Sequence, residues 1–192
     1  MDAIEKEVLR SDKDYLTNDF FFKYAIGSDT EGCQWFRNHL IIVTTDLNVV
    51  HTEVLNTSSY PGLDEKLTIL DVLAIDENGN RINLELQMYN NTKSESFRFQ
   101  FYGARMLYEQ LEKGGNYKYL KKVYKIILIN DDDQDKQLVR TYIMRDDKGL
   151  IEENHLIVRV YVNMKVVNYI LEEKRRLNLE FTLLEKIVYV FF

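Results

Sequence analysis

The chain has 192 residues, 45% hydrophobic and 29% charged, which is an ordinary composition for one globular domain with a sizeable core. A net charge of -6 excludes a protein that coats nucleic acid by bulk charge, but it allows a local basic groove. The single cysteine excludes an intramolecular disulfide framework and is typical of the reducing cytoplasm. The charged first segment has no secretory pattern, and no run approaches the roughly 18 apolar residues of a membrane span.

Two helices and a strand are predicted in the first third of the chain. Capping residues at 17–19 precede an apolar segment that Gly27 can end. A second helix is expected over Cys33–Val43, with a short strand near Val49–Leu55. The helical spacing of apolar residues in the second helix predicts an inward face formed by Trp35, Phe36, Leu40 and Ile41.

The middle of the chain predicts two strands, a helix and a third strand, at Lys66–Asp76, Arg81–Met88, Phe97–Lys113 and Val123–Asn130. The helix has one apolar stripe, formed by Phe97, Phe101, Ala104, Tyr108 and Leu111. Residues 123–130 are nearly all apolar, as expected for a strand that is covered on both faces. A strand near His155–Val162 and a closing helix from Lys165 are expected to follow.

This order of helix, three strands, helix and strand predicts an α/β fold with a mixed central sheet flanked by helices. We expect a single domain over residues 1–192, with its core at about 17–130 and a C-terminal extension at 131–192. The extension ends in the apolar run KIVYVFF. This ending indicates either that residues 188–192 pack against the fold or that the extension is shortened relative to its relatives.

The segment LDVLAIDENGNRINLELQ places acidic residues inside two strands that otherwise look buried. A three-residue loop at 77–79 would pair residues whose numbers sum to 156, so that Asp71 lies opposite Glu85 and on the same face as Gln87. A two-residue turn at Asn78-Gly79 would put the two acids on opposite faces. We predict the first register because it brings the polar residues together.

Two carboxylates about 5 Å apart repel each other unless a cation lies between them. A hard divalent cation such as Mg²⁺ resolves this conflict, because it binds oxygen ligands and needs only one or two carboxylates. Gln87 adds an amide that can position water. The alternative is that these acids, like the turn and loop acids at 76–77 and 131–133, face solvent. The sequence therefore predicts a metal site at Asp71 and Glu85 and leaves the solvated alternative open.

These residues resemble the PD-(D/E)XK nuclease superfamily and, more narrowly, its recombination-promoting nucleases, the PD-(D/E)XK family transposases. Asp71 in one strand and Glu85-Leu86-Gln87 in the next carry the resemblance. Three flanking stretches also match: TNDFFFKYAIG, RFQFYGARMLYEQL and KGGNYKYLKKVYKIILIN. The resemblance covers Thr17 to about Asn130, and the order of the stretches makes it more specific than the short motif alone.

The resemblance implies a restriction-endonuclease-like core and Mg²⁺-dependent cleavage of DNA, with Mn²⁺ able to substitute. Asp71 and Glu85 would then be metal ligands, together with the backbone carbonyl of Leu86. Gln87 would stand where most of the superfamily has a lysine, and an amide stabilises developing negative charge less well than an ammonium. The narrower group also uses glutamine, so we interpret Gln87 as a trait of that group.

A basic segment follows the predicted active-site strands. Between Lys93 and Lys125 the chain has eight Lys or Arg residues and three acids, which gives this segment a charge of +5. Arg98, Tyr102 and Arg105 share one helical face and are candidate nucleic-acid-binding residues. A solvated helix face is the alternative, and we favour it for the lysines at 113–122.

The leading hypothesis is a cytoplasmic, Mg²⁺-dependent DNA endonuclease of the recombination-promoting type, whose catalytic residues are Asp71, Glu85 and Gln87. A catalytically inactive module that binds nucleic acid or protein on the same fold is the main alternative. A homo-oligomeric structural protein is the second alternative, and a homodimer is also compatible with the nuclease. DNA is the expected partner, and no membrane is expected.

Overall fold

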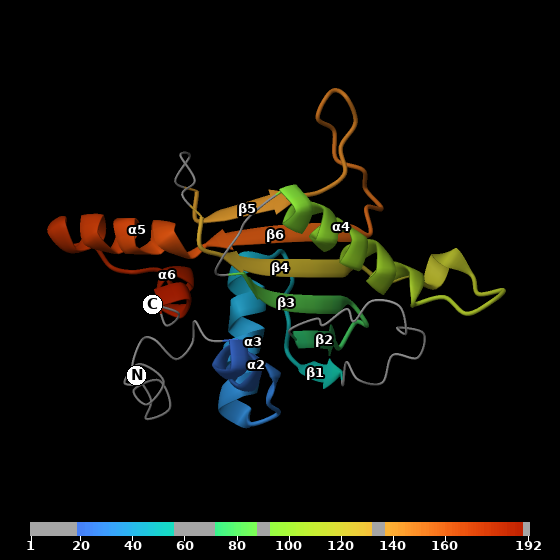
Figure 1. Ribbon diagram of the computed structural model, residues 1–192, viewed down its shortest axis with the longest axis horizontal. Coiled ribbons are helices and arrows are strands. Elements are labelled where there is room, and N and C mark those ends of the chain that lie inside the picture. Colours follow the sequence, from blue (N-terminus) through green and yellow to red (C-terminus); the bar gives the residue numbers. More distant parts are fainter. Residues whose placement is uncertain (1–18, 56–71, 88–92, 132–136, 190–192) are drawn as a thin grey trace.

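The computed structural model describes residues 19–55, 72–87, 93–131 and 137–189 (Figure 1). Within them, six strands form one sheet in the order β1-β2-β3-β4-β6-β5. β3, β4 and β6 are parallel, and the remaining neighbours pair antiparallel. The strands are β1 (Thr52–Leu55), β2 (Val72–Asp76), β3 (Arg81–Gln87), β4 (Val123–Ile129), β5 (Val139–Tyr142) and β6 (Ile157–Asn163).

Helices cover both faces of this sheet. The helices are α2 (Asp19–Gly27), α3 (Glu31–Thr44), α4 (Lys93–Tyr108), α5 (Met164–Arg176) and α6 (Leu183–Tyr189), with a short 3₁₀ helix, η2, at Tyr117–Tyr119. Side chains of α2, α3, α5 and α6 pack on one face, and α4 packs on the other (Figure 1). The predicted α/β class with a mixed, helix-flanked sheet is confirmed, and the arrangement is consistent with a restriction-endonuclease-like core.

Three element assignments differ from the sequence expectation. α4 ends at Tyr108, before the predicted end at Lys113, and the chain then continues through turns to η2. The edge strand β5 is absent from the sequence prediction. The expected closing helix is two helices, α5 and α6, separated at residues 177–182. Thr182 and Glu185 begin α6 with a capping box, in which each side chain accepts a hydrogen bond from the other's backbone N–H.

The hairpin between β2 and β3 has the predicted three-residue loop. Val72 pairs with Leu84 and Ile75 with Arg81, so that paired numbers sum to 156. Gly79 has a φ of +85°, in the left-handed region that this loop requires, and its N–H donates to the Asp76 carbonyl at 3.0 Å. The predicted register is therefore confirmed for the described part of the hairpin, whereas Asp71 lies outside the described residues.

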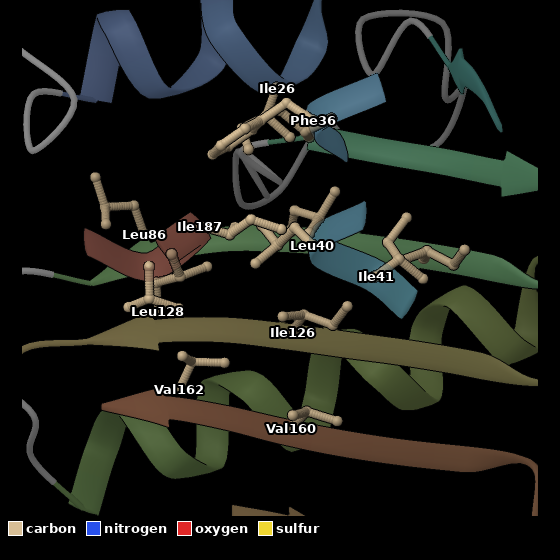
Figure 2. Close-up of a cluster of buried hydrophobic side chains, with 14 of the residues drawn as sticks. Ile26, Phe36, Leu40, Ile41, Leu86, Ile126, Leu128, Val160, Val162 and Ile187 are labelled. Atoms are coloured by element: carbon tan, nitrogen blue, oxygen red, sulfur yellow. The ribbon is translucent and has the colours of Figure 1, made fainter. Parts of the chain in front are cut away.

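The face of the sheet under α2, α3 and α6 carries the main apolar cluster of the fold (Figure 2). Alternate residues of the parallel strands point into it, among them Leu84, Ile126 and Val160, all fully buried. Phe36, Leu40 and Ile41 of α3 meet them as predicted, and Ile187 and Val188 of α6 complete the cluster. Trp35 is a correction, because it is 42% exposed and stacks on His39 at the surface.

A buried arginine joins α2, α3 and β1. Arg37 of α3 is fully buried, and its guanidinium donates to the carbonyls of Ile26 and Ser28 and to the hydroxyl and carbonyl of Thr52. Burial lowers the pKa of Arg37, and Asp29, 3.8 Å away, opposes this change. These hydrogen bonds satisfy backbone carbonyls at the end of α2 and fix the angle at which α3 meets the sheet.

α4 buries a different face from the one that its most regular apolar stripe suggests. Phe97, Phe101 and Tyr108 are 68%, 62% and 80% exposed. Phe99 and Met106 instead point to the sheet and are buried. α4 is therefore aromatic on both sides, and its inner side rests on the face of the sheet that carries Glu85.

Candidate functional site

Glu85 lies in the middle of β3, on the face that α4 covers. Its exposed fraction is 3%, although both neighbours in sequence, Leu84 and Leu86, point into the apolar core on the other face. Asn83 and Gln87 alternate with these leucines and therefore share the α4 face with Glu85. The structure thus places Glu85 and Gln87 on the same face of the sheet, as predicted.

Two cationic side chains bind the two oxygens of Glu85. The ammonium of Lys125 donates to Oε2 at 2.5 Å, and the guanidinium of Arg98 donates to Oε1 at 2.7 Å. Arg98 also donates to the side-chain oxygen of Gln87 at 2.9 Å, so that one guanidinium joins the two polar residues of β3. The buried carboxylate is therefore compensated by charges from β4 and α4.

Lys125 is the residue of this site that sequence reasoning missed. The sequence groups it with the basic segment beside a possible phosphate-binding face, but it is fully buried within β4. It lies opposite Asn83 in the parallel β3–β4 pair and donates to the Asn83 side-chain oxygen at 2.5 Å. Asn83 in turn donates to the Val72 carbonyl at 3.1 Å. A signal was present, because a lysine inside a strand covered on both faces needs a buried partner.

Arg98 reaches the site from the first turns of α4. It contacts Glu85 and Gln87 and also lies 2.6 Å from Glu95, one turn earlier, although the geometry of that ion pair does not form a hydrogen bond. Its side chain is 35% exposed, and its Nε atom is buried without a hydrogen-bond partner among the described residues. Arg98 is thus the solvent-facing cation of the site, and Lys125 is the internal one.

Aromatic rings enclose the internal cation. The Lys125 ammonium lies 5.1 Å from the centre of the Phe99 ring and 5.3 Å from that of Tyr102. These distances allow cation–π attraction, which is stronger where water is excluded. Tyr161 of β6 packs edge-on against Phe99, and burial raises its pKa above the ordinary tyrosine value. The Lys125 ammonium is therefore shielded from solvent by aromatic rings of α4, with Tyr161 of β6 packed behind them.

The other two predicted nucleic-acid-binding residues differ in their relation to the site, because Tyr102 lies beside Lys125 whereas Arg105 pairs with Glu109. Tyr102 packs partly buried against a small cluster that contains Leu73 and Met106. Arg105 lies two turns beyond Arg98 along α4 and donates to Glu109 at 2.7 Å. The structure brings Arg98 and Tyr102 to the candidate site and leaves Arg105 nearer the end of the helix.

The site presents oxygen atoms of the type that hard divalent cations bind, namely those of the Glu85 carboxylate and the Gln87 amide. Each of these oxygens accepts a hydrogen bond from Lys125 or Arg98. The Leu86 carbonyl points toward the β2 side, because the adjacent Gln87 carbonyl accepts from Asn130 on the β4 side. In the described ranges, no three residues among His, Cys, Asp and Glu gather into a metal-binding group.

The family model for PD-(D/E)XK nuclease family transposases matches residues 16–187. The chain belongs to this family. The PD-(D/E)XK assignment agrees with the resemblance found in the sequence and with the mixed sheet between helices. No curated protein and no solved structure gave a match. Among the described residues, no helix is long and apolar enough to cross a membrane.

Membership in the PD-(D/E)XK family identifies the chain as part of a nuclease family, whose substrate is DNA and whose members generally use divalent metals. The residues Glu85-Leu86-Gln87 occupy β3, next to the parallel strand β4. Leu70 and Asp71, which precede β2 in the sequence, lie outside the described residues.

Proposed function

We propose that this protein is a metal-dependent DNA endonuclease of the recombination-promoting type, which acts in the cytoplasm and hydrolyses phosphodiester bonds. The observation that carries the proposal is the buried carboxylate of Glu85, held on the same face as Gln87 by two cations from different elements. A buried position in a strand is usually occupied by an apolar residue, as the leucines on the opposite face of β3 are. A charged group in a closed, polar site is a common feature of catalytic centres.

The proposed ligands of Mg²⁺, or of Mn²⁺ in its place, are Asp71, Glu85 and the Leu86 carbonyl. When bound, such an ion polarises a phosphate oxygen and activates water. Gln87 is proposed to orient a water molecule through its amide. Arg98 is proposed to exchange its contact with Glu85 and Gln87 for a DNA phosphate, since its side chain reaches solvent. Tyr102 and Arg105 are proposed to continue this DNA-binding side along α4.

A non-catalytic binding module is the second candidate, and one observation favours it. Each side-chain oxygen of Glu85 and Gln87 already accepts a hydrogen bond from Lys125 or Arg98. A divalent ion at these oxygens would lie close to two positive charges, and Coulomb repulsion would weaken its binding unless Arg98 moved away. In this alternative, the cations would complete a purely structural network.

Nicking of supercoiled plasmid separates the two candidates. We expect the wild type to nick DNA with Mg²⁺ and to stop when EDTA removes the metal, whereas Asp71→Ala should lose the activity. Asp147→Ala removes an exposed acid between β5 and β6 and should leave nicking unchanged. A wild-type protein that binds DNA and never nicks it with Mg²⁺ or Mn²⁺ would favour the binding module instead.

The salt dependence of DNA binding tests the proposed role of α4. Charge reversal at Arg98 or Arg105 should weaken binding and lower the salt slope by about one unit for each phosphate that is no longer neutralised, because fewer counterions are released. Lys148→Glu, at an exposed loop position, is the matched control. An unchanged slope for both arginine variants would assign these residues to structural ion pairs.

A further inference from the structure

Lys125 supports an inference that rests on the proposed nuclease function. A superfamily member with lysine two residues after the glutamate would carry that ammonium on the same strand as the glutamate. Here position 87 is glutamine, whose amide accepts a hydrogen bond from Arg98 and carries no charge. A positive charge nevertheless reaches Glu85 from the neighbouring strand, through Lys125.

The strand register explains how Lys125 reaches its partner. β3 and β4 are parallel, and Lys125 is paired with Asn83, two residues before Glu85. Because alternate residues of β3 share a face, Asn83 and Glu85 lie side by side, about 7 Å apart along the strand. The extended lysine chain covers this interval, and its ammonium lies 2.5 Å from an oxygen of each residue. The position of the Lys125 ammonium therefore follows from the backbone pairing of β3 with β4.

Lys125 and Arg98 hold different oxygens of the same carboxylate. Lys125 is fully buried and binds Oε2, whereas Arg98 is partly exposed and binds Oε1. The inner contact fixes the carboxylate, and Oε1 then lies on the side of Gln87, where Arg98 bridges the two. Of the two cations, Arg98 is therefore the one that an incoming ligand would meet first from solvent.

Packing requirements alone do not account for a lysine at this position. On β4, Lys125 lies between Val123 and Ile127, which belong to two separate apolar clusters under α4. An apolar residue at 125, with another at 85, would join these clusters. Replacing a buried ion pair by well-packed apolar groups is often neutral or stabilising. The chain keeps the pair where an apolar layer would suffice, which points to a role in the site.

We infer that Lys125 is a positioning residue that supplies, from β4, the positive charge beside Glu85 that lysine at position 87 would otherwise supply. It acts through Glu85, since its ammonium is enclosed by Phe99 and Tyr102 and does not reach the surface. The positive charge beside the glutamate therefore comes from β4 and not from position 87 of β3.

The central experiment replaces Lys125 with methionine, which has similar length and no charge. We expect Lys125→Met to lower kcat for plasmid nicking by about 100-fold, in line with the loss of one preorganised charged group, and to leave KM for DNA within about threefold. Its Kd for Mn²⁺, measured by calorimetry without DNA, shows whether Glu85 still binds metal after the substitution. A merely structural lysine would instead lower Tm and leave kcat per folded molecule at the wild-type value.

Lys174→Met is the matched control, since Lys174 also donates to a buried glutamate, Glu185, at 2.7 Å, between α5 and α6. It should lower Tm and leave kcat per folded molecule unchanged. Gln87→Lys in the Lys125→Met protein should recover at least about tenfold of the lost kcat, because it restores a charge beside Glu85. The inference is wrong if Lys125→Met nicks at the wild-type rate, or if Gln87→Lys recovers nothing while Mn²⁺ still binds.

A second variant covers the case in which Lys125→Met does not fold. Gln87→Lys in the wild-type background should lower kcat or fail to raise it, because the proposed water-orienting amide is lost while Lys125 already supplies the charge. A rise above about 30-fold would mean that the site lacked this charge, and would overturn the inference. A wild type that never nicks refutes the nuclease proposal itself, which is a different result from an active wild type that is indifferent to Lys125→Met.

Discussion

The two faces of β3 and β4 are built from the same strands but differ in charge and in the extent of their apolar clusters. On one face, Leu84 and Ile126 belong to a continuous apolar cluster closed by α2, α3 and α6 (Figure 2). On the other, Glu85 and Lys125 divide the apolar layer under α4 into two small clusters. One face therefore carries the stability of the fold, which allows the other to keep a charged group.

The strongest loss of activity is expected from Glu85→Gln, which keeps the shape of the side chain and removes its charge. Nicking should fall by at least about 100-fold, since residues that only support a metal ligand typically contribute 10–100-fold. Plasmid nicking at equal folded concentration, checked by circular dichroism, measures this. Activity close to that of the wild type would remove Glu85 from the catalytic group and would break the proposed division between the faces.

Leu84→Ala changes the adjacent residue, on the apolar face. Because Leu84 is fully buried, the substitution should lower the free energy of unfolding by about 2–5 kcal/mol, through lost transfer energy and a residual cavity. Urea unfolding measures the loss. Nicking per folded molecule should stay unchanged at a temperature where the variant is folded. A selective loss of nicking, with normal stability, would show that the two faces are not independent.

Glu185 is a second buried glutamate, and the stability that it contributes depends on pH. Burial opposes ionisation of Glu185, but hydrogen bonds from Lys174 and Thr182 outweigh it and lower its pKa below the ordinary glutamate value. Its stabilising contribution is therefore complete above the unfolded-state pKa, about 4.3, and is lost as the pH falls through the folded-state pKa. The wild type should lose more stability than Lys174→Met between about pH 5 and pH 3, as measured by urea unfolding. Parallel pH profiles for the two proteins would contradict this.

The weakest response is expected on the outer side of α4. Phe97 is mostly exposed, so Phe97→Ser should change the free energy of unfolding by no more than about 0.5 kcal/mol. Phe99→Ala, two residues later on the inner side, should cost about 3–5 kcal/mol. Thermal or urea unfolding of both variants checks the difference. Equal losses would mean that a further protein surface covers the outer side in solution.

Local sequence signals predict the parts of the fold that depend on neighbouring residues. Glu77-Asn78-Gly79 is enough to choose the hairpin register, because the left-handed conformation of Gly79 and the closing hydrogen bond to Asp76 are local. The inward side of α4 is not predictable in this way. Phe97, Phe101 and Tyr108 form as regular a stripe as the buried residues do, and only the sheet decides which side is covered.

Sequence analysis predicts the residues that β3 contributes to the candidate site but not the lysine that β4 contributes. Glu85 and Gln87 can be found because their spacing within a strand puts them on one face. Lys125 escapes because its partner is 40 residues away, on a parallel strand whose register no local turn determines. The edge strand β5 is missed for a related reason, since its short, partly exposed sequence carries little periodicity and depends on β6 for its definition.

The place of β6 inside the sheet has a consequence for biosynthesis. β4 is complete at residue 129, but the strand that covers its free edge begins only at residue 157. At about 5–20 residues per second, a ribosome needs a few seconds to make the intervening chain and β6. During that interval β4 exposes a run of apolar residues able to pair with other nascent chains. A charged side chain within such a run disfavours that pairing, and Lys125 interrupts the apolar sequence of β4 with a charge.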